Sequence, residues 1–202
     1  NTMEPPFDDI RLRKAISLFI DRQSAIDALG GGDGKTRGLL QVDLWSNPDF
    51  RTWPGYNPAT KDADRAEAKR LLAEAGFKDG LKVKLVGRRP LAEQNQWWQG
   101  ALAPLGVDVE LELFDYVTFD KRRLNTDWAL IDSSISGPFP ETLEERIAQR
   151  SISPRSNIIH EDPKIADFFA RLNASPVYEQ RREGFQEMER YIIKEQFYTA
   201  QT

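Results

Sequence analysis

The sequence predicts an α/β fold with a mixed, mainly parallel sheet flanked by helices. Two segments, Lys82–Val86 and Val107–Leu113, alternate apolar and polar residues as half-buried strands do, and a helical pattern from Leu91 to Leu102 lies between them. A helix that crosses over between two neighbouring strands makes them parallel, and such crossovers are right-handed. A third apolar segment, Trp128–Ile131, follows a short helix predicted from Val117 to about Leu124. We therefore expect a sheet that is largely parallel in its interior.

The first helix is predicted within the segment Pro5–Arg22. Pro5 and Pro6 favour an extended approach, and Asp8 or Asp9 can cap the unpaired N–H groups at the start of the helix. Apolar residues then recur at helical spacing and predict one buried stripe: Leu12, Ala15, Ile16, Phe19.

A glycine-rich run, Gly30–Gly34, ends this first regular region, and the sequence from there to Pro58 predicts an irregular connection. A second helix is predicted to begin near Asp64, which has capping-box spacing to Glu67. Gly76 is its expected C-terminal stop. Its core stripe consists of four apolar residues: Ala68, Leu71, Leu72, Ala75.

The last third of the chain predicts three helices. They are expected at Glu141–Gln149, at Pro163–Leu172 after an Asp162 cap, and from Pro176 to about Ile193. Three apolar residues of the last helix fall on one face: Phe185, Met188, Ile192.

Composition limits the function classes. A chain of 202 residues is long enough for one full core, so we expect a single domain over residues 1–202. The absence of Cys excludes disulfides, thiolate metal sites and cysteine nucleophiles. The net charge of −4, with both signs interspersed, offers no basic stripe to phosphates, so nucleic acid is not an expected partner. Residues 1–9 lack the pattern of a signal peptide.

Two motifs resemble a nucleotide-binding and a metal-binding site, but the residues around them do not fit either site. Gly34–Thr36 resembles the end of a phosphate loop, but Leu29 occupies the position of the required first glycine and the segment follows a helix. His160 is the only histidine, and with no Cys beside it a zinc site would need carboxylates for all its other protein ligands. We therefore expect no metal and no cofactor.

Two places are better candidates for ligand binding. Trp45 lies in the irregular segment, where no helical or strand period requires an indole, and it could form the wall of a pocket. The loop after the third strand is the second place, because ligands of open α/β sheets bind beyond the carboxyl ends of the strands. Its polar side chains are one carboxylate and three hydroxyls: Asp132, Ser133, Ser134, Ser136.

Four blocks of sequence carry a further signal. Asn1–Arg22 contains P-P-F-D-D, R-x-R-x-A-I and I-D-R, and Ala66–Phe77 reads A-E-A-K-R-L-L-A-E-A-G-F. Gln99–Val109 follows Q-x-x-L-x-x-x-G-V-x-V, and Asn157–Gln186 places an Asn before an Asp-Pro helix start. In this order the blocks resemble the second lobe of family 5 extracellular solute-binding proteins, the peptide, dipeptide and nickel binders of ABC importers.

The resemblance implies one lobe of a type II periplasmic-binding-protein fold. It implies a binding protein and not an enzyme, which captures an oligopeptide or similar small solute between two lobes and delivers it to a membrane permease. The expected partners are the solute, the missing first lobe of the same protein and the ABC permease. The expected location is periplasmic or extracellular, at the membrane, with an export signal upstream of this chain.

The candidate loop departs from the family pattern. Peptide binders of the family usually carry W-x-x-D here, with the Asp holding a ligand's ammonium group, whereas an ungapped match places Ser133 and Ser136 at these positions. This departure weighs against a free peptide amino terminus as the recognised group and leaves Asp132 as a displaced substitute. Asn157, which matches an Asn of the family, is a further candidate at the edge of the cleft.

Two other function classes and several ligands stay open at this stage. One alternative is a small α/β hydrolase or transferase that uses Asp132, Ser133 or His160, and another is a sensory domain that kept the fold. Peptide, nickel complex, opine and oligosaccharide are all compatible with the sequence as the solute.

Overall fold

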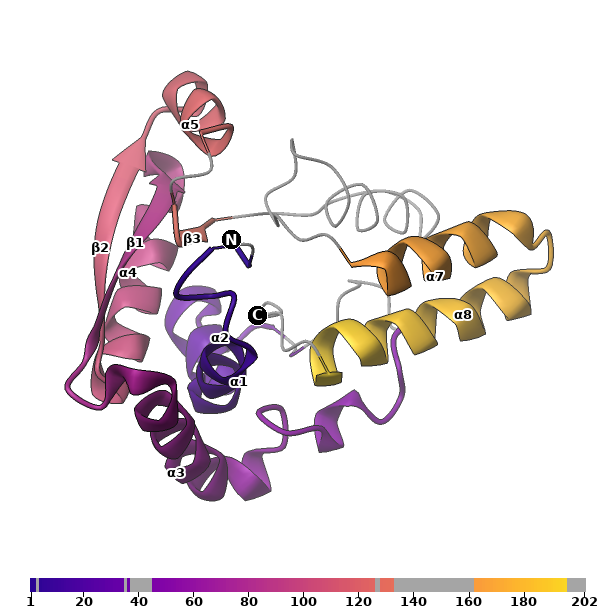
Figure 1. Ribbon diagram of the computed structural model, residues 1–202, viewed down its shortest axis with the longest axis horizontal. Coiled ribbons are helices and arrows are strands. Elements are labelled where there is room, and N and C mark those ends of the chain that lie inside the picture. Colours follow the sequence, from indigo (N-terminus) through magenta and orange to yellow (C-terminus); the bar gives the residue numbers. More distant parts are fainter. Residues whose placement is uncertain (3, 35, 37–44, 126–127, 133–161, 196–202) are drawn as a thin grey trace.

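The computed structural model describes residues 1–2, 4–34, 36, 45–125, 128–132 and 162–195 (Figure 1). The helix predicted at Glu141–Gln149 and five of the residues discussed above lie outside this part of the chain: Ser133, Ser134, Ser136, Asn157, His160. The helices and strands are, in chain order, α1 (Ile10–Phe19), α2 (Arg22–Gly30), α3 (Lys61–Leu72), β1 (Leu81–Arg88), α4 (Ala92–Leu102), β2 (Val107–Phe114), α5 (Tyr116–Arg123), β3 (Leu130–Ile131), α7 (Pro163–Ala174) and α8 (Tyr178–Arg190).

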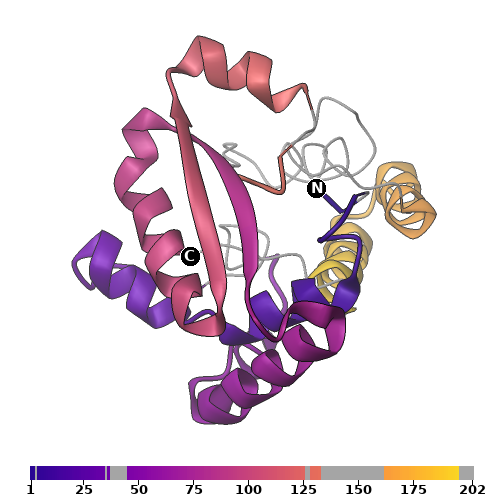
Figure 2. The same cartoon turned by 60° about the vertical axis from the view of Figure 1, so that its left-hand side comes forward.

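The described strands form a parallel sheet in the order β2-β1-β3. β1 and β2 pair over their whole length, from Leu81 opposite Val107 to Arg88 opposite Phe114. α4 connects them, and Figure 2 shows it lying along the two long strands. The side-chain amide of Gln99 in α4 donates to the backbone carbonyl of β2 at 2.6 Å. The predicted βαβ unit is therefore confirmed.

The third strand is shorter than predicted. It pairs with β1 only at Leu130 and Ile131. Trp128 precedes the strand, and its buried indole packs with Val86 and Phe119. Packing of a large side chain against β1 and α5, and not strand pairing, accounts for the apolar start of this segment.

The N-terminal region differs from the sequence prediction in two ways. Pro5 and Pro6 lie in a turn instead of an extended approach, and the helix that follows breaks after Phe19. Asp21 then begins α2, because its side chain accepts hydrogen bonds from the first N–H groups of that helix. The cap of α1 is as predicted, since the Asp9 carboxylate accepts from the N–H of residue 11.

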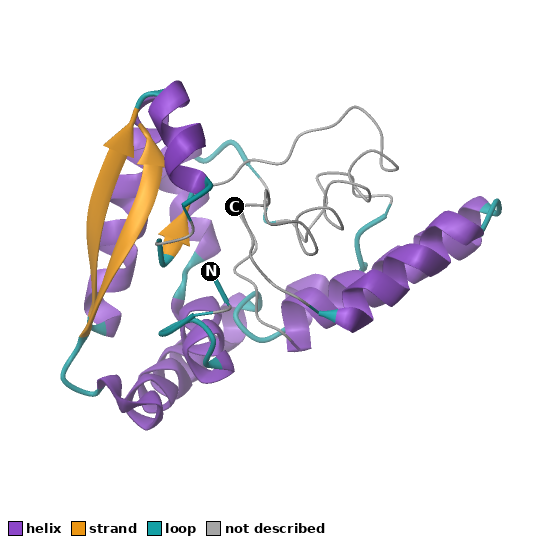
Figure 3. Cartoon of the chain, turned by 45° about the horizontal axis from the view of Figure 1, so that its top comes forward, coloured by secondary structure: helices purple, strands orange, loops and turns teal. Residues whose placement is uncertain are grey.

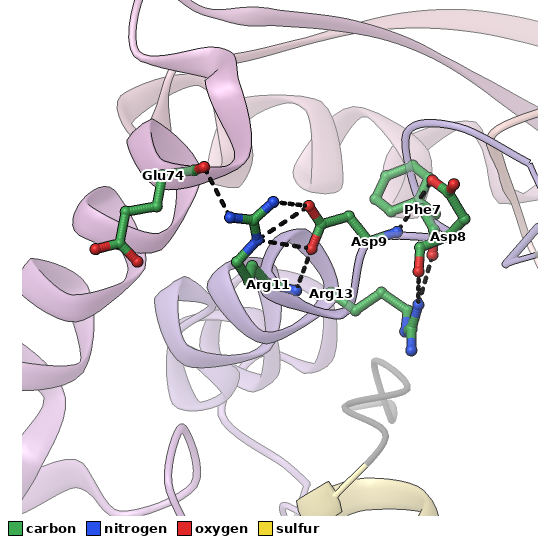
Figure 4. Close-up of polar contacts among 6 residues, drawn as sticks. All are labelled: Phe7, Asp8, Asp9, Arg11, Arg13 and Glu74. Atoms are coloured by element: carbon green, nitrogen blue, oxygen red, sulfur yellow. Dashed lines mark hydrogen bonds and ion pairs between the residues drawn. The ribbon is translucent and has the colours of Figure 1, made fainter.

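Two arginines hold this turn in place (Figure 4). The Arg13 guanidinium donates to the carbonyl of Phe7 at 2.7 Å and to that of Asp8 at 3.0 Å. Arg11 pairs with the Asp9 carboxylate and also donates to the carbonyl of Glu74 at 2.9 Å, just beyond α3. Hydrogen bonding to Arg11 lowers the pKa of Asp9 below its ordinary value.

α3 begins earlier than predicted, at Lys61, and Asp64 does not cap it. The Asp64 carboxylate instead accepts from the backbone N–H of Gly55 at 2.9 Å and from the Thr60 hydroxyl at 3.1 Å. The predicted stop is confirmed, because Gly76 adopts a φ of 94° in the π-helical turn Ala73–Phe77.

The main core lies between the sheet and the helices α1, α3 and α4. Leu12, Ile16 and Phe19 of the predicted α1 stripe are buried there, together with Leu71 of α3 and Val109 of β2. The described part of the chain has no helix that is both long enough and apolar enough to cross a bilayer.

A second core belongs to the hairpin of α7 and α8, which extends away from the sheet (Figure 3). Asp162 caps α7 as predicted, and its carboxylate also accepts a hydrogen bond from the Tyr191 hydroxyl at 2.6 Å. The predicted apolar face of the last helix is buried: Phe185, Met188, Ile192.

Candidate functional site at the carboxyl edge of the sheet

The candidate site lies where the parallel strands end. Arg88 is the last residue of β1, Asp115 follows β2, and Asp132 follows β3. Because the strands are parallel, their carboxyl ends meet at one edge of the sheet, and α5 lies at this edge (Figure 1). Open α/β sheets bind their ligands at such an edge.

Asp132 lies at this edge, as the sequence predicted, and its carboxylate is held by its own chain. The residue is only 7% exposed. One carboxylate oxygen accepts from Arg88 Nε at 2.7 Å, and the other accepts from the Arg88 backbone N–H at 2.6 Å and from Asn95 Nδ2 at 3.2 Å. The Asp132 backbone N–H donates to the carbonyl of Val86 at 3.0 Å, which fixes the loop start to β1.

Arg88 links Asp132 to the exposed surface. It is 8% exposed, and its Nη1 donates to the Tyr116 hydroxyl at 3.2 Å. The guanidinium carbon lies 5.3 Å from the centre of the Phe119 ring and 5.6 Å from that of Tyr116. Burial disfavours the charged guanidinium, but the hydrogen bonds to Asp132 and Tyr116 outweigh this effect and raise the pKa of Arg88. Arg88 and Asp132 thus form a buried ion pair.

Gly87 makes room for the third member of this group. A Cβ atom at this position would lie 2.5 Å from Asn95 Nδ2, so a larger residue would push the Asn95 amide away from its hydrogen bond with Asp132. Asn95 is 1% exposed and lies in the first turns of α4. A glycine inside a strand often marks such a close approach.

Tyr116 is the exposed member of the group. It is the first residue of α5, and 66% of its surface is accessible to solvent. Asp115 caps this helix by accepting from the N–H groups of Val117 and Thr118, and these hydrogen bonds lower the pKa of Asp115. The cap therefore fixes the direction of the first turn that presents Tyr116.

Sequence reasoning placed Asp132 but missed its three partners, Arg88, Asn95 and Tyr116. The glycine at position 87 in an otherwise apolar strand, followed by an arginine at the strand's carboxyl end, was an available signal. We refer to Arg88, Asn95, Tyr116 and Asp132 as the edge cluster.

Trp45 lies apart from the edge cluster. It is completely buried in the core of the α7 and α8 hairpin, where its indole N–H donates to the Tyr178 hydroxyl at 2.7 Å. That it forms the wall of a solute pocket stays a prediction. Trp97 and Trp98 meet edge to face with ring centres 5.3 Å apart and pack against the main core.

The described residues contain no group of three or more His, Asp or Glu side chains that could hold a metal ion. Asp132 is the acidic residue of the edge cluster, and its carboxylate accepts hydrogen bonds from one arginine and one amide side chain. This arrangement suits the fixed placement of polar groups at a binding surface, in which each buried donor and acceptor has a partner.

Comparison with known proteins gives a consistent result. Residues 1–149 match the family model described as "Bacterial extracellular solute-binding proteins, family 5 Middle". The chain is 33% identical to heme-binding protein A of Haemophilus influenzae over 85 residues, which are 41% of this chain and 14% of that protein. It is 29% identical to di/tripeptide-binding protein 1 of Pseudomonas aeruginosa over 136 residues, which are 60% of this chain and 23% of that protein.

The fold has a close match among solved structures. The murein tripeptide binding protein MppA of Escherichia coli superimposes with a TM-score of 0.83 at 22% sequence identity. The superposition covers 97% of this chain and 39% of that protein. The chain therefore corresponds to well under half the length of these relatives.

Proposed function

Because this chain belongs to family 5 of the bacterial extracellular solute-binding proteins, we propose that it is one lobe of the substrate-binding component of an ABC importer. The observation that carries the proposal is the edge cluster, which the chain places at the carboxyl edge of a parallel sheet. In open α/β sheets this edge faces the ligand. The solute is captured there between this lobe and a first lobe of the same protein, and then passes to a membrane permease.

An oligopeptide or a similar small solute is the proposed cargo. The names of the relatives support this choice, since one binds di- and tripeptides and the superimposed structure is that of a murein tripeptide binding protein. The name of another relative, heme-binding protein A, indicates that the sequence group also includes a binder of a different chemistry. A peptide is therefore the first solute to test.

The short share of each relative that the chain matches supports a two-lobe organisation. Residues 1–202 form one domain, which is the second lobe, and the first lobe and an export signal belong to the rest of the protein. The location is the periplasm or the cell exterior, next to the permease. Closure of two lobes on a solute shifts the population towards the closed form, because only that form makes contacts from both sides.

The edge cluster supports binding over catalysis. A general base must be able to take up a proton from the reacting group. The Asp132 carboxylate already accepts three hydrogen bonds from Arg88 and Asn95, and these occupy it inside the lobe. The hydrolase or transferase alternative that uses Asp132 is not favoured by this arrangement.

The proposal is tested on the full-length protein. We would purify it without denaturation, release any bound molecule by unfolding, and identify that molecule by mass spectrometry. A ladder of short peptides is the expected result. A single species that is not a peptide would overturn the peptide assignment, and an empty protein that binds no peptide in solution would count against capture altogether.

The isolated chain of residues 1–202 provides a matched control. A site that is built from two lobes loses half its contacts when one lobe is removed, so the isolated chain should bind peptide weakly or not at all. Saturable binding with a micromolar dissociation constant by this chain alone would contradict the two-lobe site.

A further inference from the structure

The Asp132 carboxylate is bound by a group of hydrogen-bond donors that forms an anion-binding site, which we call the seat. The seat consists of the Arg88 backbone N–H, Arg88 Nε and Asn95 Nδ2, at 2.6, 2.7 and 3.2 Å from the carboxylate oxygens. Hydrogen bonds to an ionised carboxylate are about twice as strong as those between neutral groups. With these three donors in place and the Asp132 side chain only 3% exposed, the carboxylate offers little access to an ammonium group of a solute.

The effect of this seat reaches the surface through Arg88. The Asp132 carboxylate accepts a hydrogen bond from Nε of the Arg88 guanidinium. Nη1 of the same group points to the Tyr116 hydroxyl and donates to it at 3.2 Å. The side chains of Arg88 and Asp132 are 10% and 3% exposed, so little of the pair faces solvent. Tyr116, by contrast, is 66% exposed. Of these three residues, Tyr116 is the one that a molecule at this edge of the sheet meets first.

Building on the proposed function, we propose that Asp132 is a positioning residue and that Tyr116 is the residue of the edge cluster that contacts the solute. Asp132 neutralises Arg88 inside the lobe and fixes it against Tyr116. The solute group that meets this edge is therefore uncharged, namely an apolar or aromatic side chain or a peptide amide that packs on the phenol ring. Asp132 does not hold the amino terminus of a peptide.

The first experiment separates positioning from ammonium binding. Trialanine and N-acetyl-trialanine are titrated into the complete two-lobe protein and into its Asp132→Asn variant by calorimetry. If Asp132 positions Arg88, the variant weakens both peptides by the same factor, about tenfold, which corresponds to the loss of a hydrogen bond to a charged group. Weakening of trialanine alone would show that Asp132 binds the ammonium group and would overturn the proposal.

Tyr116 is tested with variants of an exposed residue, which should leave the fold intact. Tyr116→Ala should weaken both peptides about tenfold or more. Tyr116→Phe, which keeps the ring and removes the acceptor of the Arg88 hydrogen bond, should weaken them by about threefold. The matched control is Leu124→Ala, which removes an exposed apolar side chain just beyond the other end of α5 and should leave the affinities unchanged. Equal affinities for wild type and Tyr116→Ala would overturn the role of Tyr116.

A third measurement needs no solute, so it can be read even where no peptide binds. Asp132→Ala removes the carboxylate and opens the seat, and 0.1 M formate should then occupy it. We expect formate to raise the thermal midpoint of this variant by several degrees more than that of the wild type. The control is Asp108→Ala, because Asp108 is an exposed residue of β2 and its loss opens no seat.

The results distinguish the two proposals. Formate rescue together with no peptide binding by the wild type would keep the seat and overturn both the peptide-binding function and the role of Tyr116. Peptide binding without formate rescue, and with an unchanged thermal midpoint in Asp132→Asn, would keep the function and overturn the seat.

Discussion

Gly55 brings its loop against the C-terminal end of α1, and its replacement by alanine should destabilise the protein strongly. Its φ is 82°, and a Cβ atom would lie 2.5 Å from the carbonyl oxygen of Ser17. The Gly55 carbonyl also accepts hydrogen bonds from two cations, at 2.7 Å from Arg22 Nη1 and 2.8 Å from Lys61 Nζ. The loop therefore cannot move away from α1 without losing these contacts.

The magnitude follows from two contributions. An L-residue in a left-handed conformation costs about 1–2 kcal/mol. The contact with the Ser17 carbonyl involves backbone on both sides, so the loop must shift, and the loss of one hydrogen bond to a charged donor costs about 1.5–3 kcal/mol. We expect Gly55→Ala to lower the free energy of unfolding by about 2.5–5 kcal/mol.

Urea denaturation followed by tryptophan fluorescence measures this loss, and two other glycines serve as controls. Gly76 has a φ of 94° but nothing within 4 Å of its Cβ position, so Gly76→Ala should show only the conformational cost of about 1–2 kcal/mol. Gly30 is the last residue of α2 and also has open space, so Gly30→Ala should cost nothing and can stabilise by up to about 1 kcal/mol.

The difference in stability loss between Gly55→Ala and Gly76→Ala separates the cost of the close contact from the cost of the positive φ. Both residues require a positive φ, and they differ in the backbone that surrounds the added methyl group. Equal losses in the two alanine variants would show that the loop adapts without cost, and the close packing of Gly55 on α1 would then contribute nothing to stability.

Three further predictions concern a charge, the core and a buried indole. Hydrogen bonds to two basic neighbours lower the pKa of Glu112, so its stabilising contribution is present above the ordinary pKa of about 4.3 and is lost as the pH falls through the lowered value. Glu112→Gln should therefore cost about 0.5–1 kcal/mol at pH 7 in urea denaturation, and the difference from wild type should shrink as the pH falls through the lowered value; a difference that persists unchanged in acid would contradict the ion-pair origin. Leu12→Ala should cost about 2–5 kcal/mol because Leu12 is 0% exposed, whereas Leu124→Ala, at a position 48% exposed, should stay within about 0.5 kcal/mol. Trp45→Phe removes the N–H that donates to Tyr178 and should cost about 1–2 kcal/mol; unchanged solute affinity in this variant would refute a role of Trp45 in a pocket wall.

The sequence predicted those elements whose cause is local. Alternation in β1 and β2 and the apolar stripe of α1 reflect burial on one face, which a short window of sequence contains. The start of α3 was predicted wrongly because the Asp64 side chain does not cap the helix. Its carboxylate instead accepts a hydrogen bond from the N–H of Gly55. A capping box is a local pattern, and a partner from the preceding loop can override it.

The edge cluster also depends on contacts between distant residues, which a short window of sequence does not contain. The position of Asp132 after a parallel strand follows from a general rule of α/β sheets, so sequence alone could place it. Its partner Arg88 is 44 residues away, and the two meet only because β3 pairs with the C-terminal half of β1. In the register observed, Ile131 lies opposite Val86, so the chain brings Asp132 beside the end of β1. Had the pairing slipped by one residue, successive side chains would face opposite sides of the sheet, and Asp132 would be left without its arginine. Whether an acidic residue at this edge is available to a solute therefore depends on strand register, which the local sequence pattern does not contain.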